Sequence, residues 1–462
     1  MKDAACDELY ISFLFPPSGY VSGITVFKRI AENGRAVDVL QADNSSKSSQ
    51  LNEYVEEYIN KRILIDIDCD VDWTDCIFKF TKRGLDAIEE DYERIYSRSW
   101  LMANHFLASE YKFAHPDVFW TAEFSDPLIF NLSNDVKYYK QMMIDNEEYI
   151  RKINEHISLL NEKNCTDFPL VENNVSAYYV AEYLTYLFAD RIIFTNENQK
   201  IIMLKQFPVD VYDFVIEKTV VERHPTLDGK YYHLIDSDID LDDDYINLAY
   251  FGKDYYGERH FESLFYALES LNHKFKDKIR IYLFIYDSAL LRQLVNTLDS
   301  SDNFIVKEPL DYLEFLNATT KFDVLIVNDV ITKGNYQINP YLPSKLSDYL
   351  GSESDIWALY EKGSSLSNFD VKYKSDILDF KECTNQLINI LNDNGYADED
   401  SEIDDKFYDR LTSLNQLVER LFRQNLKLKR EVKKVKRENE EMMSSNSWKL
   451  TQPLRKLRNS KK

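Results

Sequence analysis

Short apolar runs alternate with helical stretches along the chain, and this alternation occurs twice. In the first series, LYISFLF at residues 9–15 reads as a strand, and Gly19 and Gly23 after it permit a tight turn. Apolar residues then recur at helical spacing over residues 24–30, and AVDVLQA at residues 36–42 supplies the next strand. A strand, a helix and a second strand in this order predict a parallel sheet.

The second series runs from INLAYFG at residues 246–252 to FDVLIVND at residues 322–329. A stretch with Pro, Gly and an acidic run separates the two series and reads as an interdomain linker. Two α/β domains that face each other across a cleft are the simplest architecture, with ligands at the carboxyl ends of the strands. The expected boundaries are 1–225 for the first domain, 226–246 for the linker, 247–400 for the second domain, 401–443 for a coiled coil and 444–462 for a basic tail.

Composition limits the classes of protein to which the chain can belong. Its 462 residues are too many for one ordinary core, and the formal net charge of −23 argues against nucleic-acid binding by the body. The five cysteines are scattered without a CxxC pair, so we expect neither a disulfide framework nor a zinc site, which fits a reducing cytoplasm. We expect no signal peptide, and no apolar run reaches the roughly 18 residues of a membrane span.

The C-terminal part differs in kind from the two domains. Apolar residues and two asparagines follow one another there in steps of three and four, the heptad spacing typical of a coiled coil. The two seam positions are occupied by Leu411, Val418, Asn425, Val432 and Asn439, and by Leu414, Leu421, Leu428, Val435 and Met442. Asparagine in the first seam favours a parallel two-stranded pairing, so we expect a homodimer. A lone amphipathic helix packed on the body is the alternative.

The end of the chain is strongly basic. From Leu421 onward it carries fourteen Lys or Arg and four Glu. Trp448 and three leucines stand among these charges, so residues 444–462 are suited to lie on an anionic membrane surface. A solvated tail is the alternative. We therefore expect a cytoplasmic protein that binds peripherally to the inner face of the cell membrane.

Seven motifs, taken in their order along the chain, resemble those of the GT-B glycosyltransferases, and within them the family 4-like enzymes of bacterial surface-polysaccharide assembly. They are FPPSGYVSG, YSRSW with NHFLA, WTAEFSDP, IIFTNENQ, ERHPTL, YFGKDYYGERHF and LPSKLSDYL. The resemblance covers about residues 9–395 and rests on the order and spacing of motifs that are weak individually. It implies two Rossmann-like domains, with the acceptor in the first and a nucleotide-sugar in the second.

The resemblance also implies a set of donor-binding residues: Gly19, Gly23, Lys253, Arg259, Ser344, Lys345, Leu346 and Asp348. Lys253 and Arg259 would neutralise the diphosphate, because its departure builds up negative charge that must be stabilised, with no metal required. The helix start in LPSKLSD would bind phosphate through its N–H groups, and Asp348 would bind the ribose hydroxyls. The two glycines would approach the phosphate from the first domain. A solvated helix start and a capping box are the ordinary alternatives.

The first domain offers polar candidates for the acceptor side. Glu123 and Asp126 in TAEFSDP stand at a strand end, and His105 stands in NHFLA. Each is a candidate catalytic base toward an acceptor hydroxyl or a ligand of the donor sugar. Structural roles are the alternatives, because Asp before Pro often caps a turn and a single His on an apolar helix is often a core residue. The resemblance adds three cleft residues of FTNENQ: Thr195, Asn196 and Glu197.

Two positions depart from the family pattern. Pro340 stands where family 4 enzymes usually carry a Glu that contacts the transferred sugar, so the identity of that sugar stays open. Glu353 stands where relatives tend to have Gly in a tight turn.

The expected function is transfer of a sugar from a nucleotide-sugar to a glycan or lipid-linked acceptor in surface-polysaccharide biosynthesis, without metal or cofactor. The family likeness alone implies retention of anomeric configuration. A catalytically inactive scaffold is one alternative, supported by Pro340 and the acidic linker. A polyol-phosphate transferase of the teichoic-acid type is another, although the seven scattered His residues count against it. A Rossmann oxidoreductase fails because no GxGxxG follows a predicted strand.

Overall fold

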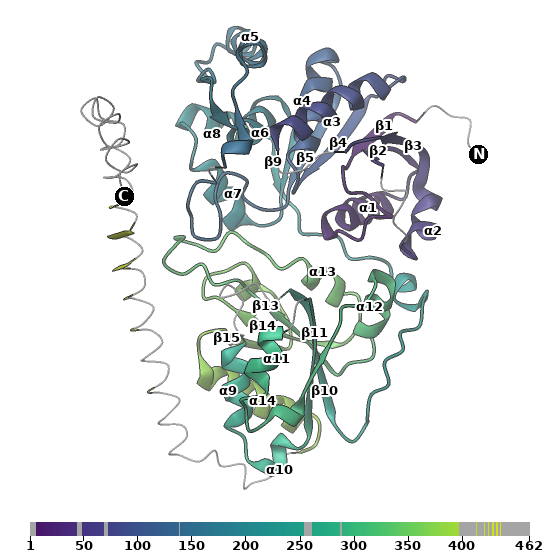
Figure 1. Cartoon of the computed structure of the whole chain (residues 1–462), viewed down its shortest axis with the longest axis vertical. Coiled ribbons are helices and arrows are strands. Elements are labelled where there is room, and N and C mark those ends of the chain that lie inside the picture. Colours follow the sequence, from purple (N-terminus) through teal and green to yellow (C-terminus); the bar gives the residue numbers. More distant parts are fainter. Residues whose placement is uncertain are drawn as a thin grey trace, which may run out of the picture.

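Two parallel sheets form the cores of two α/β domains, one above the other in Figure 1. The computed structural model describes residues 6–43, 49–68, 73–137, 139–253, 261–286 and 289–396, together with isolated positions between 413 and 435.

The first domain contains a seven-stranded sheet in the order β3-β2-β1-β4-β5-β8-β9, in which all neighbours are parallel. Its strands are β1 (Glu8–Ile11), β2 (Val37–Ala42), β3 (Ile59–Ile65), β4 (Arg94–Ser99), β5 (Phe119–Phe124), β8 (Arg191–Phe194) and β9 (Thr219–Val221). Its helices are α1 (Val21–Asn33), α2 (Leu51–Val55), α3 (Thr74–Ala87), α4 (Ala103–Ala114), α5 (Glu147–Asn164), α6 (Ala177–Phe188), α7 (Glu197–Leu204) and α8 (Val209–Ile216). A small antiparallel pair, β6 (Met143–Ile144) and β7 (Val175–Ser176), flanks α5 in the chain.

The second domain contains a six-stranded sheet in the order β12-β11-β10-β13-β14-β15, again parallel throughout. Its strands are β10 (Ile246–Lys253), β11 (Ile279–Tyr286), β12 (Phe304–Lys307), β13 (Val324–Asn328), β14 (Asp355–Tyr360) and β15 (Tyr373–Asp376). Its helices are α9 (Glu262–Glu269), α10 (His273–Lys276), α11 (Ala289–Val295), α12 (Tyr312–Thr319), α13 (Lys345–Tyr349) and α14 (Phe380–Asp393). In both sheets the strand order reverses beside the first strand, which is the switch point where such sheets bind ligands.

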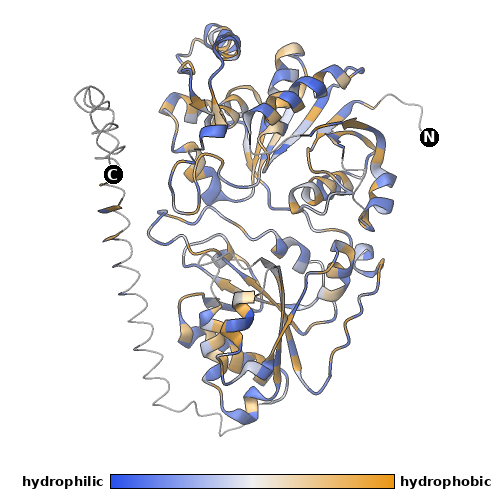
Figure 2. Ribbon diagram, in the orientation of Figure 1, coloured by the Kyte–Doolittle hydropathy of each residue, from blue (hydrophilic) through white to orange (hydrophobic). Residues whose placement is uncertain are grey.

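The apolar content of the strands explains this architecture. Every residue of β2 and β13 is buried, as expected when helices cover both faces of a parallel sheet, and Figure 2 shows many hydrophobic residues on the strands. The strand predicted over residues 9–15 ends earlier, at Ile11. Beyond it, two backbone hydrogen bonds to β2 remain, and the backbone N–H of Phe13 donates to Oδ1 of Asn104 (2.8 Å).

One buried apolar cluster is shared by both domains. It includes Phe27 of α1, Tyr231 and Tyr232 of the connecting segment, and Leu346 and Tyr349 of α13. The rings of Phe27 and Tyr231 meet edge to face at 5.9 Å. The segment between the two sheets is therefore packed against both domains.

Three other expectations concern the cysteines, the membrane and the C-terminal part. We expected no disulfide framework, yet Cys76 is disulfide-bonded, whereas Cys6, Cys165 and Cys383 are free. None of the helices in the described ranges has the length and hydropathy needed to cross a bilayer. The basic tail and most of the coiled coil lie outside the described residues, so both stay predictions.

Candidate active site

Loops that follow strands of both sheets meet where the domains touch. Asn196, in the loop after β8, donates through Nδ2 to the carbonyl oxygen of Pro340 in the loop after β13 (3.0 Å). The hydroxyl of Tyr336, also in the loop after β13, donates to the carbonyl oxygen of Asn131 in the loop after β5 (2.6 Å). Each of these loops leaves the carboxyl end of its strand. The ligand-binding edges of the two sheets therefore face one another.

Glu123 near the end of β5 lies at the centre of a buried ion-pair network. Its Oε2 accepts from Nε of Arg29 (2.9 Å) and from the hydroxyl of Tyr96 (2.7 Å), and its Oε1 accepts from Nε of Arg98 (3.0 Å). Burial by itself would raise the pKa of Glu123, but the charges of Arg29 and Arg98 lower that pKa to about 2. This arrangement suits a positioning role better than proton transfer at neutral pH.

The same network fastens the chain that leaves the first domain. Nη2 of Arg29 donates to the carbonyl oxygens of Glu222 (3.3 Å) and Arg223 (3.0 Å). Nη2 of Arg98 lies 3.1 Å from Nε2 of His224, and burial with the charge of Arg98 lowers the pKa of His224 to about 3. The ERHPTL segment is thus tied to α1, β4 and β5 through buried charges.

The other two predicted catalytic residues lie in different surroundings. His105 is buried between Trp120 and Phe124, its Nδ1 lies 2.8 Å from Oγ of Ser97, and burial lowers its pKa to about 3. It is a neutral core histidine of α4, as the structural alternative stated. Asp126, two residues beyond β5, is partly exposed. Of the three candidates, Asp126 is therefore the one whose side chain is not fully buried, and its catalytic role stays a prediction.

The loop that contains Gly19 and Gly23 requires glycine at only one of these two positions. A Cβ at Gly23 would lie 1.8 Å from the carbonyl oxygen of Leu14, so close packing of α1 against the loop requires glycine there. A Cβ at Gly19 would meet no atom within 4 Å, so Gly19 borders open space. Beside it, the half-exposed rings of Tyr20 and Trp100 stack at 5.9 Å. The loop is thus open at the switch point between β1 and β4.

The predicted cleft residues of FTNENQ divide between two roles. Oγ1 of Thr195 donates to Oε1 of Gln199 (2.7 Å), and Oδ1 of Asn196 accepts the backbone N–H of Gln199 (2.9 Å) as the cap of α7. Oδ1 of Asn196 also accepts from Oγ of Ser365 in the second domain (2.9 Å). Glu197 is exposed and pairs with Lys200. Asn196 is therefore a domain contact, and Glu197 is a surface residue.

Asp348 in α13 is buried and already has partners. Its Oδ1 accepts from Nζ of Lys28 in α1 (2.5 Å) and from the hydroxyl of Tyr312 (2.7 Å), and Nζ of Lys28 also donates to Oγ of Ser347 (3.1 Å). The hydroxyl of Tyr232 donates to the carbonyl oxygen of Asp348 (2.6 Å). The predicted ribose carboxylate thus forms an ion pair with the opposite domain.

The remaining predicted donor residues are only partly described. Ser344 makes no side-chain capping bond, and α13 has five residues, so its dipole is small. Lys345 is half-buried and Leu346 lies in the shared apolar cluster. Lys253 ends β10, and Arg259 lies outside the described residues.

Comparisons with known proteins agree with this geometry. No family model matches the chain, and no curated protein matches its sequence. Its structure is similar to HepE of Anabaena in complex with UDP and glucose, with a TM-score of 0.51, 10% identity and coverage of 90% of this chain and 99% of that chain. It is also similar to sucrose-phosphate synthase of Thermosynechococcus elongatus, with a TM-score of 0.50, 13% identity and coverage of 91% and 99%. A glycosyltransferase of Rickettsia africae gives a TM-score of 0.50 at 11% identity, with coverage of 92% and 96%. The chain has the GT-B fold.

Three charged residues of this GT-B chain were missed from the sequence: Lys28, Arg29 and Arg98. The first two could have been found from the sequence, because they are adjacent basic residues within the apolar repeat of residues 24–30. Arg98 stands between two serines at the end of a strand, which is the edge where GT-B ligands are expected. All three side chains are less than a tenth exposed.

Buried polar side chains hold the loop around Pro340 in place. Nδ2 of Asn339 donates to the carbonyl oxygen of Val330 (2.9 Å) and to Oε2 of Glu361 (2.8 Å). Glu361 is buried and also accepts from the N–H and Oγ1 of Thr332 (2.9 and 2.7 Å). Both side chains fasten this loop. Glu353, at the other departure from the family pattern, has a φ of 66°, the left-handed region that favours glycine.

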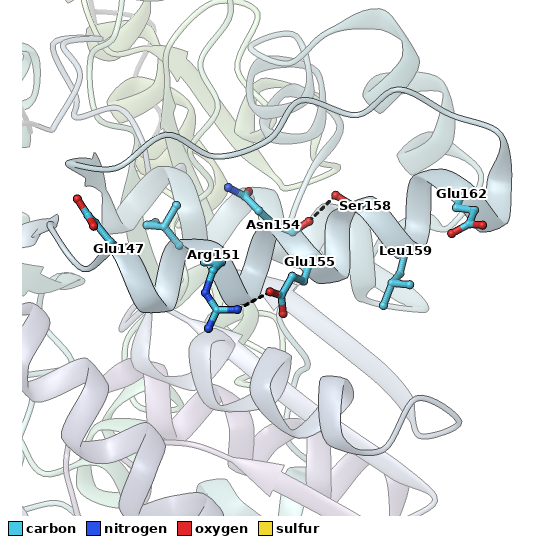
Figure 3. Close-up of a pocket in the computed structure, with 8 residues that line it drawn as sticks. Glu147, Arg151, Asn154, Glu155, Ser158, Leu159 and Glu162 are labelled. Carbon is cyan, nitrogen blue, oxygen red and sulfur yellow. Dashed lines mark hydrogen bonds and ion pairs between the residues drawn. The ribbon is translucent and has the colours of Figure 1, made fainter.

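A surface pocket of about 770 Å³ lies on α5 (Figure 3), the helix at the end of the first domain that is far from the second domain in Figure 1. All of its lining residues come from this one helix, and among them Nη1 of Arg151 pairs with Oε1 of Glu155 (2.6 Å). One helix does not enclose a ligand, so no site is assigned there. In the described ranges no three His, Cys, Asp or Glu side chains gather as metal ligands, and metal independence stays a prediction.

Proposed function

We propose that the protein is a glycosyltransferase of the hexosyltransferase type, which moves a sugar from a nucleotide-sugar to a glycan or lipid-linked acceptor. The observation that carries this proposal is the meeting of the carboxyl edges of two Rossmann-like sheets at one junction. HepE, whose structure is similar, is described in complex with UDP and glucose and with UDP-glucose. A role in surface-polysaccharide assembly, retention of configuration and metal independence are parts of the proposal.

In this proposal the second domain holds the donor. Lys253 and Arg259 stabilise the charge that develops on the departing diphosphate, and the turn at Ser344, Lys345 and Leu346 lies beside the phosphates. Asp348 binds the ribose hydroxyls. The open loop at Gly19 lets the phosphate approach the first domain closely.

Asp126 is the proposed base toward the acceptor hydroxyl, because it is partly exposed at the end of β5. Glu123 is proposed as a positioning residue, since it holds Arg29 and Arg98 in place.

The test is transfer of label from radioactive UDP-, GDP-, ADP- and CDP-sugars to a bacterial envelope extract. We expect one donor class to be used and Asp126→Asn to lower the rate by about 10²- to 10⁴-fold. Glu155→Gln, which changes an exposed carboxylate on α5, should leave the rate unchanged. The proposal is wrong if no donor is used. That result would favour an inactive scaffold in which Asp348 stays paired with Lys28.

A further inference from the structure

Lys28 and Asp348 form a buried ion pair between the two domains. Lys28 lies within α1 and Asp348 within α13, which face each other in Figure 1. Their charged atoms are 2.5 Å apart, and their side chains are 3% and 9% exposed. Two charges withdrawn from water to this extent are stable only while each has its partner.

The hydrogen bonds around the pair occupy one of the two carboxylate oxygens, Oδ1. Oδ1 of Asp348 already accepts from both Lys28 and the hydroxyl of Tyr312 (2.7 Å). Nζ of Lys28 donates to Ser347 as well (3.1 Å) and lies 5.9 Å from the ring centroid of Tyr312. A ligand hydroxyl that is to donate to Oδ1 must therefore displace one of these donors.

Lys28 is the donor that can leave. Tyr312 belongs to the same domain as Asp348, but Lys28 belongs to the other one, so separating the domains removes it from the carboxylate and returns its ammonium group to water. We propose that Lys28 gates Asp348: it pairs with the carboxylate when the cleft is empty and releases it to a ligand hydroxyl. This inference rests on the proposed function, in which that hydroxyl belongs to the ribose of a nucleoside diphosphate.

Gating links nucleotide binding to the position of the domains. A ligand that takes Asp348 weakens the contact between α1 and α13, and a change that weakens this contact must favour the ligand to the same extent. Removing the charge of Lys28 should therefore increase nucleotide affinity and loosen the junction, although Lys28 lies in the domain that does not hold the nucleotide.

The experiment compares the full-length protein with its variants Lys28→Met and Lys28→Gln. The second variant keeps a hydrogen-bonding group, so the test can still be made if Lys28→Met does not fold. Lys205→Met is the matched control, because Nζ of Lys205 donates to Oε1 of Gln337 across the same junction (3.1 Å) without contacting Asp348. UDP, GDP, ADP and CDP are titrated calorimetrically, and small-angle scattering gives the radius of gyration without ligand.

We expect both Lys28 variants to bind the preferred nucleotide at least tenfold more tightly than the unmodified protein and to have a larger radius of gyration, with Lys205→Met unchanged in affinity. Equal or weaker binding by both Lys28 variants, with normal binding by the unmodified protein, would overturn the gate but leave the transferase proposal standing. Absence of binding by every protein would overturn both.

Discussion

At the scale of single residues, Glu123 connects several parts of the first domain through hydrogen bonds. Two arginines and a tyrosine occupy both of its oxygens, and through them it holds α1, β4 and the chain that leaves the first domain. The pKa of about 2 keeps the carboxylate ionised, so the two buried guanidinium groups are never left without an anion near neutral pH.

We predict that Glu123→Gln lowers the free energy of unfolding by about 3–5 kcal/mol, because it removes the carboxylate that pairs with the buried guanidinium group of Arg98. Denaturant unfolding measures this change. Glu197→Gln removes an exposed ion pair and should change the stability by less than about 1 kcal/mol. Full stability of Glu123→Gln together with loss of sugar transfer would instead identify Glu123 as a catalytic residue.

Glu182 in α6 should make stability depend on pH. Its Oε1 accepts hydrogen bonds from the backbone N–H groups of Leu128 (2.8 Å) and Ile129 (3.0 Å), which lower its pKa. Burial has the larger effect and raises the pKa from 4.5 to about 7. Since the folded pKa lies above the unfolded one, ionisation of Glu182 costs stability as pH rises from 4.5 through about 7.

The corresponding prediction concerns Glu182→Gln relative to the unmodified protein. The difference in their free energies of unfolding should shift in favour of the variant by about 1.4 kcal/mol per pH unit in that window, and by about 3 kcal/mol in total at pH 8. Other titrating groups cancel in the difference. A difference that stays constant from pH 5 to about pH 8 would show that Glu182 keeps an ordinary pKa.

At the scale of elements, the sequence predicted the two parallel sheets because buried strands such as β13 (VLIVN) are almost continuously apolar. It did not single out β3, whose sequence INKRILI carries polar residues and is less buried. The site was predicted only in part. Pro340 and Asn196 were both identified, but their hydrogen bond joins two loops of different domains, and no local pattern contains such a contact. The pairing of Lys28 with Asp348 was missed for the same reason.

Asn196 caps helix α7 and also contacts the second domain. Replacing it should therefore have a larger effect than replacing an ordinary cap residue. We predict that Asn196→Ala costs about 1 kcal/mol for the cap of α7 and loosens the junction, because the bonds to Pro340 and Ser365 are lost. Asn146→Ala is the matched control, since Asn146 caps α5 through the N–H of Tyr149 (3.0 Å). Thermal unfolding and small-angle scattering should show a larger radius of gyration for Asn196→Ala alone. Identical scattering of the two variants would mean that Asn196 acts only as a cap.

At the scale of the whole molecule, we propose that the C-terminal heptads form a dimer contact that is separate from the GT-B body. Leu428, Val432 and Val435 are exposed by 60%, 54% and 53% and follow the predicted seam. In the proposed homodimer a second copy covers them.

Deleting residues from Leu411 onward should therefore yield a monomer with unchanged nucleotide binding. Analytical ultracentrifugation distinguishes the two states. A truncated protein that still sediments as a dimer would show that the coiled coil is not the dimer contact.

The central claim is that the junction of the two sheets binds a nucleotide-sugar. The most direct measurement is calorimetric titration of the purified protein with UDP, GDP, ADP and CDP, in parallel with the double variant Lys253→Ala, Arg259→Ala. The account predicts binding of one nucleotide and its loss in the double variant, because these two side chains are proposed to neutralise the diphosphate. Failure of all four nucleotides to bind, or equal binding by the double variant, would contradict it.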